Sequence, residues 1–171
     1  MKPIYAMFAR YNAWANRRLY DAAAALPDAD YRAERGAFFG SLHKTLNHLL
    51  ATDRIWMHRF TGEGPTYTRL DVVPCEDFQL LRSEREAEDR RIEAFVDGLD
   101  EARLAQTFTY RTITSPMDVT QPLAPALSHF FNHQTHHRGQ AHALLSGIGG
   151  RDAAPSFDLI LFQRETGIGL T

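Results

Sequence analysis

Apolar side chains recur every three or four residues along four stretches of the chain, a period typical of amphipathic helices. The predicted helices span residues 4–26, 42–60, 74–96 and 122–145. Ser41 is the expected N-cap of the second helix, and Pro74 suits the first turn of the third. Proline or glycine follows the first, second and fourth helices, where each apolar pattern stops. We expect the four helices to bury their apolar faces in one shared core.

The segments between and after these helices predict smaller elements. Residues 106–120 are rich in β-branched and aromatic side chains, which favours a small β-hairpin or an extended crossover. A turn of helix is expected at residues 33–35, and a short terminal helix at residues 157–165. The predicted fold is therefore an all-α four-helix bundle, with a long crossover before the last helix that contains a small hairpin. At this length the whole chain, residues 1–171, is expected to be a single domain.

Charge is spread along the chain and disfavours a nucleic-acid partner. The formal net charge is −2, and only two lysines, Lys2 and Lys44, are present. Binding to phosphates through charge needs clustered lysine and arginine side chains. Residues 82–91 are almost all charged, and we interpret them as a solvated face of the third helix with pairs at i,i+4.

The compartment follows from the cysteine count and the hydropathy. Cys75 is the only cysteine, so no disulfide forms within the chain, which fits a reducing environment. No apolar run approaches the roughly 18 residues of a membrane span, and the N-terminal residues lack the apolar core of a secretory signal. We expect a cytoplasmic protein that has no membrane partner.

Four of the eight histidines lie between residues 129 and 140, in the predicted fourth helix. Residues four apart on a helix stack one turn apart on the same face. By helical phase His137 falls on the core-facing stripe and His133 beside it, whereas His129 and His136 turn toward solvent. His133 and His137 are thus a candidate pair of metal ligands. A hydrogen-bonded structural pair is the alternative that the residues alone leave open.

A metal site would need a third ligand, and the second helix offers His43, His48 and His58. His48 is the most central, but it sits at the edge of the apolar stripe, so the sequence leaves its orientation open. Three imidazoles with an open position are typical of a catalytic zinc, nickel, iron or copper ion. Asp53 is a candidate second-shell or proton-transfer group, with a salt-bridged helix residue as the alternative.

Motifs of other enzyme classes are absent from the sequence. It contains no glycine-rich phosphate loop, no G-x-S-x-G turn and no paired-cysteine zinc motif. It also lacks the Glu-x-x-His motif on which di-iron bundles depend, which argues against a di-metal carboxylate centre.

Four segments together resemble the DinB family, the small helical bundles grouped with the YfiT-like metal-dependent hydrolases. They are Y-N-A-W-A-N at 11–16, the H-x-x-x-x-H-L-L-A-T-D-R-I-W-M-H-R-F segment at 43–60, H-F-F-N-H-Q-T-H-H-R-G-Q at 129–140 and F-D-L-I-L-F-Q-R-E at 157–165. The resemblance spans nearly the whole chain. It implies a four-helix bundle, commonly a homodimer, with a divalent metal on three histidines. By motif position these are His48, His133 and His137.

The resemblance implies two hypotheses about function. In the first, the protein is a metal-dependent enzyme acting on a small molecule, either a hydrolase or a transferase that uses a low-molecular-weight thiol. Zinc or nickel is then the expected ion, with iron as an alternative, and Asp53 or His129 moves protons. In the second, it is a non-enzymatic stress-response protein whose metal is structural or sensory. A fourth protein ligand would favour the second hypothesis, and an open position the first.

Overall fold

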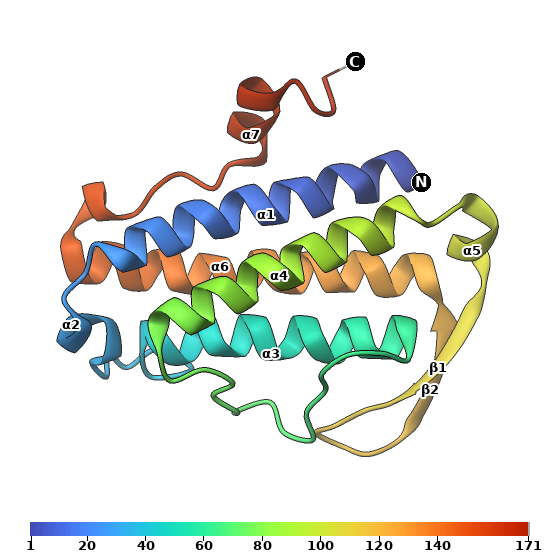
Figure 1. Ribbon diagram of the computed structural model, residues 1–171, viewed down its shortest axis with the longest axis horizontal. Helices are drawn as coiled ribbons and strands as arrows, with labels where there is room; N and C mark the ends of the chain where they lie inside the picture. The colour runs from blue at the N-terminus through green and yellow to red at the C-terminus, as the bar shows by residue number, and fades with distance from the viewer. Residues whose placement is uncertain (171) are drawn as a thin grey trace.

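Four long helices form a bundle in the computed structural model, which describes residues 1–170. They are α1 (Lys2–Ala24), α3 (Leu42–Thr61), α4 (Phe78–Asp97) and α6 (Leu123–Gly149). Helix α1 packs against α4 and α6, and α3 packs against the same two helices. Figure 1 shows α1 and α6 running in one direction and α3 and α4 in the other. The all-α bundle expected from the sequence is confirmed.

Shorter elements join the long helices. Helix α2 (Asp28–Arg32) precedes α3, and α5 (Glu101–Ala105) follows α4. Strands β1 (Thr107–Arg111) and β2 (Asp118–Pro122) then form an antiparallel hairpin, which confirms the hairpin expected between the third and fourth helices. A 3₁₀ turn, η1 (Arg151–Ala153), and α7 (Leu159–Thr166) close the chain. No helix among residues 1–170 is both long and apolar enough to cross a bilayer.

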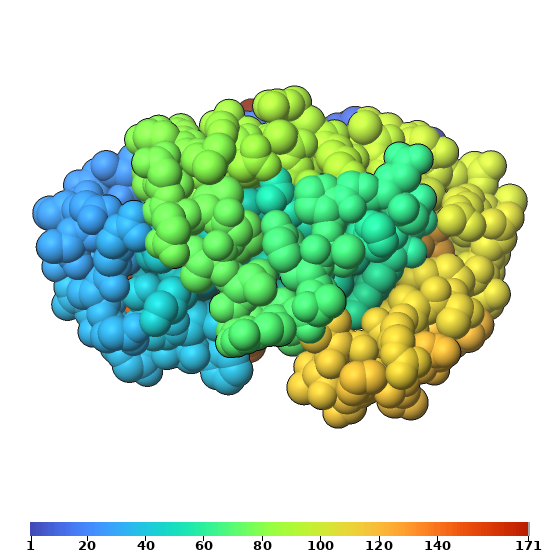
Figure 2. Space-filling model, turned by 60° about the horizontal axis from the view of Figure 1, so that its bottom comes forward, coloured from blue at the N-terminus to red at the C-terminus, as the bar shows by residue number. Residues whose placement is uncertain are grey.

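Two connections lie against each other at one edge of the bundle. The first is the loop at residues 62–77, which must return along the bundle because α3 and α4 run the same way. The second is the β1–β2 hairpin, whose Tyr110 ring lies 5.1 Å from the ring of Trp56 on α3. Figures 1 and 2 show the loop (green) meeting the hairpin (yellow to orange). Together they cover part of the outer face of α3.

A buried polar layer lies between the two larger of the three apolar clusters in the core. One cluster, near the hairpin, includes Phe60 and Leu127, and the other, near α2, includes Leu46 and Leu145. Between them each long helix contributes buried polar side chains, among them Asn12, Asn16, Asp53, Arg85, Asp89 and Arg138. Several of these groups bond to one another: Asn16 donates to Asp89 over 2.9 Å, and Arg85 donates to Asp53 over 2.6 Å. Pairing of this kind is required of charges held away from water.

The polar layer corrects one expectation about the third long helix. The charged residues 82–91 were expected to form a solvated face, but Arg85, Glu88 and Asp89 are buried. The run therefore has two sides, and one of them faces partners on α1 and α3. The pairs at i,i+4 are present nonetheless, as between Arg85 and Asp89 at 3.0 Å.

Two expected boundaries were also wrong. Helix α4 begins at Phe78 rather than Pro74, because Asp77 caps it by accepting a hydrogen bond from the Leu80 amide. The amide of Cys75 is instead bound to the Asn47 side chain, which holds this segment outside the helix. The short turn expected at residues 33–35 lies earlier, in α2. Helix α6 ends at Gly149, within the glycines that follow residue 145 and were expected to end it.

Candidate metal centre

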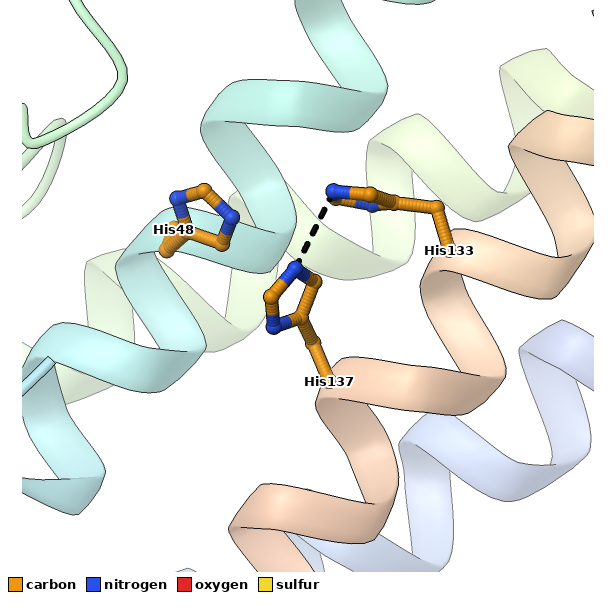
Figure 3. A group of neighbouring side chains, drawn as sticks. All are labelled: His48, His133 and His137. Carbon is orange, nitrogen blue, oxygen red and sulfur yellow. Dashed lines mark hydrogen bonds between the residues drawn. The ribbon is translucent and has the colours of Figure 1, made fainter. Parts of the chain in front are cut away.

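Helices α3 and α6 bring three histidines together across their interface. His48 lies in the second turn of α3, and His133 and His137 lie one turn apart on α6. Ligating nitrogens of all three lie within 4.8 Å of one another. Figure 3 shows the three rings converging, with a hydrogen bond of 3.0 Å joining Nε2 of His133 to Nε2 of His137. The cluster is compatible with a divalent metal ion.

Hydrogen bonds on the far side of two rings determine which nitrogen faces the cluster. The Nδ1–H of His48 donates to the Leu70 carbonyl over 2.9 Å, and the Nδ1–H of His137 donates to Gln140 Oε1 over 2.8 Å. Their Nε2 lone pairs are therefore left for the cluster. Nε2 of His48 is buried and has no hydrogen-bond partner within the described chain. Metal-ligating histidines commonly hold their second nitrogen in this way.

Burial keeps the three imidazoles neutral. Desolvation lowers the pKa of His48 to about 4, an effect that the Leu70 carbonyl partly opposes and His137 reinforces. Desolvation, followed by repulsion from the neighbouring histidines, lowers the pKa of His133 to about 3. The pKa of His137 is also lowered, again mainly by desolvation. A neutral imidazole is the form that binds a metal, so all three are ready ligands at pH 7.

The cluster is covered on one side and open on another. Phe39, from the connection before α3, stacks on the His48 ring with centroids 3.9 Å apart. His133 is less buried than His48 and His137 and lines a cavity of about 450 Å³. The cavity is bounded by α3, α6, the hairpin and Leu70 of the loop at residues 62–77. A small molecule in the cavity would reach the cluster past His133.

The other histidines lie as helical phase predicted, with His129 next to the cluster. The exposed His129 lines the same cavity, and its ring centroid is 5.7 Å from that of His133. Desolvation and the nearby Arg59 charge lower its pKa. His136 is exposed, and His142 packs against Phe157 on a different face of α6.

The structure does not bring Asp53 to the histidine cluster. Its carboxylate accepts from Arg85 in the polar layer, and its residue surface is only 1% exposed. Desolvation raises the pKa of Asp53 to about 6, although the Arg85 charge opposes the rise. The salt-bridged alternative considered from the sequence describes this placement.

Sequence reasoning missed three residues that support the histidine cluster. Two of them accept hydrogen bonds from the histidines, and the third is an aromatic residue that stacks on one of the rings. Gln140 follows His137 by three residues, a helical spacing that was available as a signal. Leu70 acts through its backbone carbonyl, so its side chain carries no signal. Only the fold shows that Phe39 stacks on the His48 ring.

Comparison with known proteins shows to which family the chain is similar. The model of the DinB family matches residues 1–168. Protein DinB of Bacillus subtilis (strain 168) is 26% identical over 164 residues, which cover 91% of this chain and 92% of that protein.

Proposed function

This chain belongs to the DinB family, and we propose that it is a divalent-metal-dependent enzyme whose ion is held by His48, His133 and His137. The observation that carries the proposal is the buried Nε2 of His48, which lacks a hydrogen-bond partner in the described chain and lies within 4.8 Å of the ligating nitrogens of the other two. Leaving a buried polar atom unpaired costs roughly 1–3 kcal/mol. A metal ion removes that cost by accepting the lone pair.

The reaction proposed is hydrolysis or transfer to a low-molecular-weight thiol. A bound divalent ion would supply Lewis acidity, activating a water or thiol or polarising a carbonyl. The chain's own residues hold and orient the reactants: the three histidines fix the ion, and the cavity beside His133 receives a small molecule. We assign proton transfer to His129 rather than Asp53, because His129 lines the cavity and the Asp53 carboxylate is bound to Arg85.

The donor set favours zinc or nickel, with iron as an alternative. Three neutral imidazoles suit borderline ions, whereas magnesium and calcium prefer oxygen ligands. Cys75, the one thiol, pairs its backbone amide with Asn47. Burial raises the pKa of its thiol, so it is a poor thiolate donor.

A structural or sensory ion in a non-enzymatic protein is the second candidate. Such sites in zinc proteins are normally closed by a fourth protein ligand. Within residues 1–170 only three histidines make up the cluster, and a cavity adjoins it. Both observations favour the enzyme. A cytoplasmic homodimer acting on a small molecule completes the proposal.

The proposal is tested by replacing His137 with alanine. We expect the purified wild-type protein to hold close to one divalent ion per chain by elemental analysis, and His137→Ala to hold almost none. His136→Ala is the matched control, because His136 is the adjacent histidine on α6 and is exposed. Its metal content should equal that of the wild type.

Either of two results would overturn the site: a full equivalent of metal in His137→Ala, or an equal loss in His136→Ala. Turnover is then tested with thiol cofactors and electrophilic or ester substrates, comparing metal-loaded with chelator-treated protein. Equal activity in the two preparations would favour the non-enzymatic alternative.

A further inference from the structure

Arg59, on α3, is a half-buried cation without a carboxylate partner. Its guanidinium lies over the rings of Trp56 and Tyr110, 4.6 Å from each centroid. Its hydrogen bond in the described chain is one donated to the Arg111 carbonyl over 3.1 Å. No ion pair joins it to an acidic side chain of residues 1–170.

Three other arginines of the described chain are buried, and two of them are in ion pairs, whereas the third, Arg138, donates hydrogen bonds to the side chains of Asn12 and Thr135. Arg54, on the same helix, forms ion pairs with Glu84 and Glu88. Arg85 forms ion pairs with Asp53 and Asp89. Desolvation lowers the pKa of Arg59, and the only charge effect opposing it comes from the Tyr110 hydroxyl. The protein therefore bears the cost of burying the Arg59 charge without an anion of its own.

The cavity that Arg59 lines is otherwise free of charge. It is the cavity beside the histidine cluster, which also contains His129 and His133. Both histidines have lowered pKa values and are neutral at pH 7. No acidic side chain lines it. The remaining walls are apolar or carry hydroxyls, among them Ile55, Trp56, Ile113, Met117, Thr112 and Ser115.

Stacking between two aromatic rings holds the guanidinium plane in place. A guanidinium presents parallel N–H groups that fit a carboxylate in a bidentate manner. When the fork is already oriented, less side-chain freedom is lost on binding. Arg59 thus has the features of an anion-binding group, and the single positive charge matches a monoanion better than a phosphate dianion.

We propose that Arg59 binds the carboxylate of a small-molecule substrate, whose apolar body lies along Trp56 and the hairpin and whose reacting group points to the histidine cluster. Arg59 and His48 stand about three turns apart along α3, so the two recognised ends of the substrate belong to an elongated molecule. This assignment deepens the proposed function and rests on it for the direction of the reacting group. The carboxylate site itself stands on Arg59 and the cavity.

The test compares a carboxylate with its neutral amide. Phenylacetate and phenylacetamide are titrated into the full chain by calorimetry at fixed ionic strength, with and without added zinc. We expect the wild type to prefer phenylacetate, and Arg59→Gln to bind it at least about tenfold more weakly while binding phenylacetamide unchanged. Arg90→Gln is the matched control, since Arg90 is exposed on α4 and its loss changes the net charge equally.

Arg59→Lys is a second variant, to be used if circular dichroism shows that Arg59→Gln does not fold. It keeps the charge but not the bidentate fork, and should lose several-fold in affinity for phenylacetate. The proposal is overturned if the wild type shows no preference for phenylacetate. It is also overturned if the folded Arg59 variants keep the wild-type preference, or if Arg90→Gln loses as much.

The titrations with and without added zinc distinguish a failure of this proposal from a failure of the proposed metal site. If the preference for phenylacetate requires zinc and ignores Arg59, the ion holds the carboxylate and our assignment is wrong. If metal content fails in the wild type while the preference still depends on Arg59, the proposed function fails and the carboxylate site stands.

Discussion

The two nitrogens of each ring in the histidine cluster have different roles and are best considered separately. For His48 and His137, one nitrogen donates to an oxygen of the protein and the other faces the cluster. The donors fix both the tautomer and the ring orientation. Sequence spacing can place an imidazole on a helix face, but it cannot say which nitrogen points inward. That distinction comes from Leu70 and Gln140, which lie outside the ligand set.

Protonation of these rings should govern the acid stability of the metal-free protein. Unfolded histidine has a pKa of about 6.5, whereas burial lowers that of His133 to about 3. Between these values the unfolded chain binds the proton more readily. The free energy of unfolding should therefore fall as pH drops from about 6.5 toward 4, by up to ~1.4 kcal/mol per pH unit for this ring.

Urea denaturation with chelator present measures this slope between about pH 7 and pH 4.5. His133→Gln should flatten it, because glutamine does not titrate. His136→Gln is the control and should keep the wild-type slope, since His136 is exposed. Identical slopes for all three proteins would contradict the prediction.

At the scale of elements, apolar periodicity predicted α1, α3 and α6 well, and the β-branched and aromatic content of residues 106–120 predicted the hairpin. These helices bury residues at regular spacing, so the spacing of apolar residues within each helix is enough to predict which of its faces is buried. Helix α4 was predicted less well, because its buried side carries Arg85, Glu88 and Asp89. From the sequence alone, a charged residue that is buried and paired with another helix cannot be distinguished from one that is exposed to water. For the same reason His48 needed a resemblance to identify it, as its partners lie on α6.

The pairing of Asp53 with Arg85 predicts a large effect on stability and none on the metal. Asp53→Ala leaves a buried guanidinium with one carboxylate fewer, which should lower the free energy of unfolding by about 3–5 kcal/mol. Urea denaturation measures the loss. Asp71→Ala is the control, since its ion pair with Arg69 is exposed to solvent and should leave stability near the wild type.

Metal content should be unchanged in Asp53→Ala, because Asp53 makes no hydrogen bond to the three histidines in the described chain. A variant that is as stable as the wild type yet has lost its ion would contradict this placement. It would return Asp53 to the candidate site as a supporting group.

For the whole molecule, an ion at this site would link two helices that are far apart in sequence. Ligands from α3 and α6 come together only in the folded bundle, so an ion binds the native state and not the unfolded chain. At a hundredfold excess over its dissociation constant, it should stabilise the fold by about 2.7 kcal/mol. In a domain of this size that corresponds to a rise in Tm of about 5–10 °C.

Thermal unfolding followed by circular dichroism checks this linkage. Chelator should lower the Tm of the wild type and of His136→Ala, and zinc should restore it. The Tm of His137→Ala should respond to neither. An equal response in His137→Ala would place the stabilising ion elsewhere.

The parallel course of α3 and α4 has a consequence for how this bundle could change its chemistry. Because those helices run the same way, the chain needs a long return connection, and that connection and the hairpin form walls of the cavity. The histidines, by contrast, stand on helices. Surface connections tolerate altered length and composition far better than packed helices do. The architecture therefore separates a fixed reactive centre from exchangeable walls, so a different substrate could be accommodated without rebuilding the bundle.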